Sequence, residues 1–303
     1  MRNLFKIIAA ALLLAFAPRI AAAEAAPTVT VAHPLLWEID DGAARVYLFG
    51  SIHVMKPDTV WLSDDLQRRF DSAGQAWFEV ADLDDQAAVQ QQAQRYMLDP
   101  SGHMTAGLTP AEVVRLDALL APYGLGSAQM MGYRKWAVAL VLNVQQIAAA
   151  GYNPKTGVDL TLLQQARATG KPVHGFETID QEMQKLAPAD DAEDMAALRS
   201  AIADSATSAQ DIADLFQAWA NGDEKRLTSF MVDKMKAESP SLYRRVIVER
   251  DAAWTPQVER LVRDLKAQGG GTAFVTVGVG HLVGPDSLIA MLRADGAKVK
   301  QVE

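Results

Sequence analysis

Residues 45–58 read RVYLFGSIHVMKPD, and residues 272–286 read TAFVTVGVGHLVGPD. Each stretch opens with an apolar, β-branched run, which is typical of a strand buried on both faces. Each then continues as Gly-x-x-His-(Val/Leu)-x-x-Pro-Asp and is followed by a hydroxyl residue. Four identities at fixed spacing within nine residues indicate an internal repeat. Because both copies fall where a strand ends ahead of a helix, they predict two related strand ends in one α/β sheet.

The rest of the chain supplies further strands and many helices. The expected strands lie at 75–81 and 171–177, with a helix near 63–73 after the first copy of the repeat. A strand–helix–strand unit of this length favours parallel strands. Helical patterns alone fill residues 85–150 and 178–268. We therefore predict an α/β fold with a central mixed, largely parallel sheet, two large helical insertions and the Gly-x-x-His motifs at C-terminal ends of strands.

The N-terminus predicts export. Residues 1–23 combine Arg2 and Lys6, an apolar run about half the length of a membrane span, and a small-residue cleavage site at 21–23. We expect a cleaved Sec-type signal and a periplasmic or secreted protein. Residues 24–34 should form a flexible lead-in, and 35–303 a single domain. Since no later segment is long and apolar enough to span a membrane, no stable span is expected after cleavage.

Charge and cysteine content exclude several classes of function. The chain has a net charge of −8, and loss of the three basic residues of the signal would bring it near −11. A nucleic-acid partner is therefore not expected, because such a field repels polyanions. The chain has no cysteine, which excludes disulfides, thiolate metal sites and a cysteine nucleophile.

Two imidazoles and two carboxylates are predicted to meet at the strand ends. His53 and His281 end the two copies of the repeat, and Glu79 and Glu177 each follow a phenylalanine at the end of a strand. In open α/β sheets, ligands bind beyond the carboxyl ends of the strands. Neutral imidazole and carboxylate suit manganese, cobalt or zinc, and a bound water would then be the nucleophile. A structural, hydrogen-bonded role is the alternative for each residue alone, and the repeat argues against it.

At these residues the chain resembles the TraB/PrgY/GumN family, which includes the Tiki-type metalloproteases. The resemblance rests on two Gly-x-x-His motifs, at 50–53 and 278–281, with a strand that ends in glutamate after the first. Further similar segments are Lys135-Trp136, Gly157-Val-Asp159 and the 249–254 stretch. The Tiki-like relatives imply peptidase activity on a peptide or protein substrate, with a divalent metal as cofactor.

Two positions depart from the family pattern. Gln181 is one residue away from the spacing at which the family carries glutamine, and Glu182 stands there instead. Asp251 stands where asparagine is usual. Beside it, Arg250 is a candidate to orient a carboxylate or bind an oxyanion, since its fork geometry suits both. A structural ion pair is the equal alternative for Arg250.

Three functions remain open at this stage. The first is an exported metal-dependent hydrolase, a peptidase, that uses His53, Glu79, Glu177 and His281, with Arg250. The second is a non-catalytic periplasmic binding or regulatory protein that uses the same cleft. The third is a metal-free hydrolase resembling erythromycin esterases, with histidine as base. The remaining histidines should lie apart from the site, with His33 and His103 in exposed loops and His174 on the opposite face of its strand from Glu177.

Overall fold

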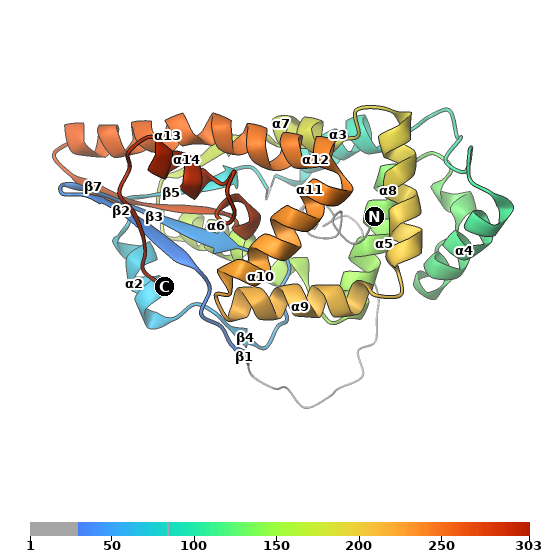
Figure 1. The fold of residues 1–303 in the computed structure, drawn as a ribbon, viewed down its shortest axis with the longest axis horizontal. Coiled ribbons are helices and arrows are strands. Elements are labelled where there is room, and N and C mark those ends of the chain that lie inside the picture. The colour runs from blue at the N-terminus through green and yellow to red at the C-terminus, as the bar shows by residue number, and fades with distance from the viewer. Residues whose placement is uncertain (1–29, 84) are drawn as a thin grey trace.

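The computed structural model describes residues 30–83 and 85–303, and a six-stranded sheet forms its centre (Figure 1). The strand order is β6-β5-β7-β3-β2-β8. The strands are β2 (Leu36–Asp41), β3 (Ala44–Ser51), β5 (Gln75–Val80), β6 (Val173–Glu177), β7 (Gly271–Gly278) and β8 (Val299–Gln301). The first four in this order run parallel, and β2 runs antiparallel to both of its neighbours. The predicted mixed, largely parallel sheet is confirmed.

The two copies of the repeat lie on neighbouring strands. β3 and β7 pair in parallel, with Gly50 opposite Val277 and Ser51 opposite Gly278. The copies are thus one residue out of register, and their histidines follow adjacent strand ends. A Cβ atom at Gly50 would lie 2.8 Å from Cγ2 of Val279, so glycine permits this close approach.

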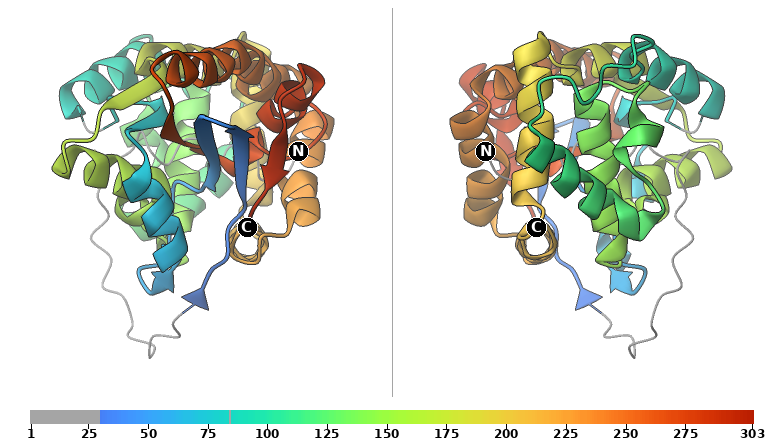
Figure 2. Two further views of the ribbon diagram at one scale, coloured as in Figure 1. Left: turned by 90° about the vertical axis from the view of Figure 1, so that its left-hand side faces the viewer. Right: turned by 90° about the vertical axis from the view of Figure 1, so that its right-hand side faces the viewer.

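Helices cover both faces of the sheet. The helix α13 (Glu249–Ala267) packs on β3 and β7, with α14 (Leu288–Ala294) beside it. On the other face, α2 (Asp64–Ser72) contacts β7, and α6 (Val158–Ala168) contacts β5 and β6. Figures 1 and 2 show α13 and α14 above the sheet and α2 below it. The result is a three-layer sandwich whose apolar strands are buried on both faces.

The two helical regions extend the molecule beyond the strand ends, on the right of Figure 1. The first holds α3 (Gln86–Met97), α4 (Pro110–Leu120) and α5 (Lys135–Ala149). The second holds α7 (Ile179–Leu186), α8 (Asp191–Asp204), α9 (Ser208–Ala220), α10 (Glu224–Thr228), α11 (Lys234–Glu238) and α12 (Pro240–Tyr243), and leads into α13. The buried helix α5 packs against α8 and α9, which joins the two regions.

Several helix boundaries follow the sequence signals. Ser63 caps α2 by accepting a hydrogen bond from the Leu66 N–H. Thr109 and Glu112 form a capping box at the start of α4, where Pro110 is the first helical residue. Gly170 follows α6 with φ of 70°, the left-handed conformation that ends many helices.

Other expectations were wrong in detail. The strand β2 was not predicted. The lead-in at 24–34 contains a short strand, β1 (Thr30–Val31), which pairs with β4 (Thr59–Val60). The first copy of the repeat therefore leads into β4, whereas Ser287 after the second copy caps α14. The residues after the first copy form a strand because they pair with β1, a segment that precedes the motif in the chain.

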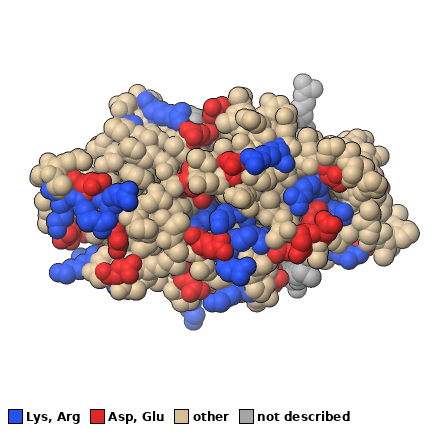
Figure 3. Space-filling model, turned by 90° about the horizontal axis from the view of Figure 1, so that it is seen from above, with Lys and Arg blue, Asp and Glu red and all other residues tan. Residues whose placement is uncertain are grey.

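The predicted signal at 1–23 lies outside the described residues and stays a prediction, as does location. Within the part of the chain that the structure describes, no helix has the length and apolar character needed to cross a bilayer. On the face along which α13 runs, acidic and basic side chains are interspersed (Figure 3).

Candidate functional site

A small cavity of about 30 Å³ lies at the C-terminal ends of β3, β5 and β7. Both repeat histidines line it, together with Glu79 and Arg250. The other lining residues are Ser51, Ile52, Met231, Met235, Ile247, Gly278 and Gly280. Four of the five residues singled out by sequence thus meet at one place, and the fifth, Glu177, is bound to Arg250.

A buried aspartate orients His53. Nδ1 of His53 lies 2.8 Å from Oδ2 of Asp159, whose other oxygen accepts a hydrogen bond of 2.5 Å from the Ser51 hydroxyl. Asp159 reaches this position because α6 begins against the motif: the Val158 N–H donates to the Ile52 carbonyl. A Cβ atom at Gly157 would collide with the His53 backbone, so only glycine fits there.

His281 has the same arrangement. Its Nδ1 lies 2.7 Å from Oδ1 of Asp251, in the first turn of α13. Its Nε2 lies 3.2 Å from Nη1 of Arg250 and 3.8 Å from Oε1 of Glu79. Trp254, one turn further along α13, packs against the imidazole with ring centroids 4.6 Å apart. Each repeat histidine therefore has its Nδ1 held by an aspartate, which fixes the orientation of the ring.

Arg250 holds two of the predicted glutamates. Its Nη2 donates to Oε2 of Glu79 at 2.6 Å and to Oε1 of Glu177 at 2.5 Å. Oε1 of Glu79 also accepts from the Gly278 N–H at 2.5 Å, so the second copy of the repeat positions this carboxylate directly. The side chain of Arg250 is 1% exposed, and its guanidinium lies over the Trp254 ring. Because Arg250 is buried and bonded to both carboxylates, its contacts favour a role in orienting Glu79 and Glu177.

Three carboxylates surround the guanidinium. Glu79, Glu177 and Glu182 each offer an oxygen within 4.8 Å of the others, a spacing that an ion could bridge. Nη2 of Arg250 already lies among them, 3.8 Å from Oε1 of Glu182 as well as bonded to the other two. A second cation at that point would be repelled at close range. Arg250 also lines the cavity between the histidines and Glu79, where its Nη1 lies 3.2 Å from Nε2 of His281, so a metal bound there would displace this contact.

The pKa values reflect an excess of acidic groups. Burial opposes the charged form of His53, but Asp159, with help from Glu79 and Glu182, raises the pKa of the imidazole to about 9. Burial would also raise the pKa of Glu79, yet Arg250 and the two histidines lower it to about 2. Glu79 is thus an ionised acceptor at neutral pH.

The other two glutamates respond in the opposite direction. Burial, which outweighs Arg250, raises the pKa of Glu177 and raises that of Glu182 to about 8. Burial likewise raises the pKa of Asp251 to about 6 against the pull of His281. A carboxyl group whose pKa lies near neutrality is able to exchange a proton under physiological conditions, and Glu182 has this property.

The remaining histidines lie apart from the cavity, as expected. His33, His103 and His174 are exposed, and His174 stacks on Trp77 at the surface. A larger cavity of about 320 Å³ lies between α8 and α12, lined in part by Glu193, Ser241 and Arg245. It contains none of the predicted site residues.

Sequence reasoning missed Asp159, Asp251 and Glu182 as site residues. Asp159 and Asp251 lie 106 and 30 residues from the histidines that they hold, and only the fold brings them together. Both stood in segments that carry the family resemblance, and Glu182 stood at the position where glutamine is usual. Gln181 has a structural role, because it forms a capping box with Thr178 at the start of α7.

Comparison with known proteins identifies the family of the chain. The model of the TraB/PrgY/gumN family matches residues 35–301. The chain belongs to this family. A protein of Treponema pallidum (strain Nichols), described as an uncharacterized protein, is 24% identical over 272 residues, which cover 86% of this chain and 80% of the relative. No solved structure gives a significant match.

Proposed function

We propose that this TraB/PrgY/gumN family protein is a metal-dependent hydrolase that cleaves peptide bonds outside the cytoplasm. One observation carries the proposal: two histidines from the two ends of the chain line one cavity, and each has its Nδ1 held by a buried aspartate. This carboxylate–histidine arrangement is the usual support of a metal-ligating imidazole.

The donor set fits a divalent cation. His53, His281 and Glu79 would hold it, because they are the imidazole and carboxylate groups that line the cavity. Glu177 and Glu182 lie next to Arg250, while Asp159 and Asp251 each hold one of the two histidines. A cavity of about 30 Å³ has space for an ion and a water, since one water needs roughly 10–15 Å³ by this measure.

Each group of the site has its own role in the proposed hydrolysis. A bound divalent cation supplies a water of lowered pKa and polarises the scissile carbonyl. Asp159 and Asp251 hold the imidazoles, and Arg250 with the Gly278 N–H orients Glu79. The water oxygen would bond to the carbonyl carbon, the C–N bond would break, and the leaving amine would take up the proton that the water gives up.

Metal analysis and peptide cleavage test the proposal together. Protein beginning at residue 24 should carry or take up one equivalent of manganese, cobalt or zinc. It should cleave a quenched-fluorescence peptide library and lose that activity in EDTA. Both His53→Ala and His281→Ala should abolish cleavage while the circular dichroism spectrum is unchanged. The exposed His103→Ala and His174→Ala are the matched controls, and should retain full activity.

A metal-free hydrolase is the second candidate, favoured by one observation. The Ser51–Asp159–His53 chain resembles the orienter and base of hydrolases that use imidazole alone. Chelation by EDTA distinguishes the two candidates. If hydrolysis of esters or peptides survives exhaustive chelation, the metal-free mechanism holds and the metal-dependent mechanism is wrong. If no metal and no substrate class gives turnover, the protein is a non-catalytic binding protein.

A further inference from the structure

The cavity has two chemically different walls. The imidazole, carboxylate and guanidinium groups come from the strand ends and from α13. The opposite wall consists of apolar side chains, namely Ile52, Met231, Met235 and Ile247. All four are buried. These residues belong to the hydrophobic core, and a group that enters the cavity would contact them.

Two residues of this apolar wall lie on π-helical turns of the backbone. Met231 belongs to a π-helical turn at Ser229–Asp233, and Ile247 belongs to a second π-helical turn at Arg244–Val248. Short π-helical turns are rare and are concentrated at functional sites, because the extra residue in the turn redirects side chains. Two such turns on one small cavity therefore indicate that the direction of these apolar side chains matters.

Met231 lies directly against the second copy of the repeat. A Cβ atom at Gly280 would lie 3.1 Å from Cε of Met231 and 3.8 Å from Cδ1 of Ile247. The absence of a side chain at Gly280 thus leaves space for Met231, and Met231 and His281 line the same cavity.

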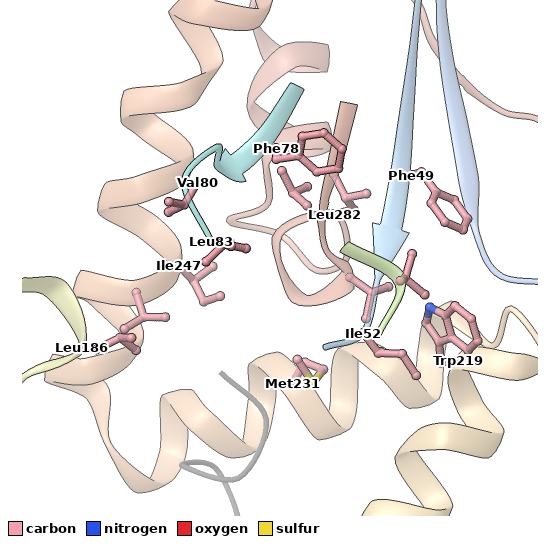
Figure 4. Close-up of a cluster of buried hydrophobic side chains, with 14 of the residues drawn as sticks. Phe49, Ile52, Phe78, Val80, Leu83, Leu186, Trp219, Met231, Ile247 and Leu282 are labelled. Atoms are coloured by element: carbon pink, nitrogen blue, oxygen red, sulfur yellow. The ribbon is translucent and has the colours of Figure 1, made fainter. Parts of the chain in front are cut away.

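The wall residues belong to a larger cluster of buried apolar side chains. Figure 4 shows Val80, Leu83 and Leu186 on the same side of the view as Ile247, with Met231 at the lower centre and Ile52 to its right. Val80 and Leu83 follow Glu79 along the chain, and both are buried.

We propose that the substrates are peptides with a large apolar side chain beside the scissile bond, and that Met231 and Ile247 form the surface that selects it. This inference rests on the proposed hydrolase function. A charged or hydroxyl side chain placed there would lose its hydration without gaining a partner, which makes the discrimination strong. The cavity is too small for a leucine side chain at rest. The unbranched side chains of Met231 and Met235 are the ones able to move aside, since methionine has three rotatable bonds.

Cleavage of a matched peptide series tests the proposal. The series varies the residue on each side of the scissile bond among leucine, phenylalanine, serine, lysine and aspartate. Wild-type kcat/KM should be on the order of 100-fold higher for leucine than for aspartate at one of the two positions. Met231→Gln, which nearly keeps side-chain size, and the smaller, polar Ile247→Asn should each reduce this ratio to below about tenfold. Met131→Gln, at a half-buried methionine outside the cavity, should leave the ratio unchanged.

A binding measurement separates this inference from the proposed function. His53→Ala protein should bind Ac-Ala-Leu-Ala-Ala-NH2 at least tenfold more tightly than Ac-Ala-Asp-Ala-Ala-NH2 in calorimetry, and Met231→Gln should remove the difference. If no peptide is cleaved but this preference holds, the hydrolase assignment fails and the apolar surface stands. Equal binding of both peptides, or an unchanged cleavage ratio in both wall variants, overturns the inference.

Discussion

Asp159 and Asp251 determine how the two repeat histidines present themselves to the cavity. Each aspartate accepts a hydrogen bond from Nδ1 of its histidine, which fixes the ring so that Nε2 is the atom directed away from the aspartate. The repeat itself was visible in sequence and predicted His53 and His281 correctly as neighbours. Their partners were not predictable from spacing, because an aspartate on α6 and another on α13 become partners only when both helices pack on the sheet.

Replacement of Asp159 by asparagine tests this role. Asp159→Asn keeps the side-chain shape but removes the charge that holds the imidazole, so kcat/KM and metal affinity should fall about 10–100-fold. Both are measured on protein with an unchanged melting temperature. Asp286→Asn is the matched control, because Asp286 belongs to the repeat yet bonds to Lys236 and Tyr243. A loss of activity as large in the control would show that any aspartate change near the motifs is damaging.

Arg250 has a second role, in stability. Arg250→Met leaves Glu79 and Glu177 buried without their cation, and should lower the free energy of unfolding by about 3–5 kcal/mol. Urea denaturation measures the change. Arg263→Met removes an exposed arginine 3.7 Å from Glu259, and should cost less than about 1 kcal/mol. Equal effects of the two substitutions would contradict the assignment of Arg250 as the buried centre of the cluster.

At the scale of the elements, local signals predicted most boundaries and long-range pairing produced the errors. Ser63, Thr109 and Gly170 mark helix ends in both sequence and structure, because each acts on its own neighbours. The strand β4 was missed because its partner β1 lies about 30 residues upstream. Likewise, β3 and β5 are parallel but not adjacent, since β7 inserts between them.

The close approach of the two copies of the repeat gives a prediction for Gly50. Gly50→Ala brings a Cβ atom against the Val279 side chain and should destabilise the protein by about 1–3 kcal/mol. The double variant Gly50→Ala with Val279→Ala should recover part of this loss in urea denaturation. Gly132→Ala, where a Cβ atom meets nothing within 4 Å, is the control. An unchanged stability of Gly50→Ala would show that the two segments separate readily.

At the scale of the whole molecule, ion pairs join the helical region to the turn that bears Ile247. Glu193 on α8 accepts hydrogen bonds from Arg245, Ser241 and the Ala189 N–H. Although burial would raise the pKa of Glu193, these partners lower it to about 2. The free energy from this group is fully present above its unfolded pKa of about 4.5 and is lost as pH falls toward about 2.

The pH dependence of stability follows from that shift. The contribution of Glu193 is at most about 3 kcal/mol, of which about 2 kcal/mol should be gone by pH 3. In urea denaturation, the stability difference between wild type and Glu193→Gln should therefore be large at pH 7 and small at pH 3. A difference that stays constant with pH would mean that Glu193 is not held by charge.

The central position of β7 has a consequence for synthesis. This strand and His281 come after β2, β3, β5 and β6 in the chain, yet β7 fills the middle of the sheet between β5 and β3. A nascent polypeptide therefore lacks the middle of its sheet and one of its two repeat histidines until β7 has been synthesised. A chain that stops before β7 leaves β3 and β5 without the strand that joins them, and the candidate site cannot assemble in it.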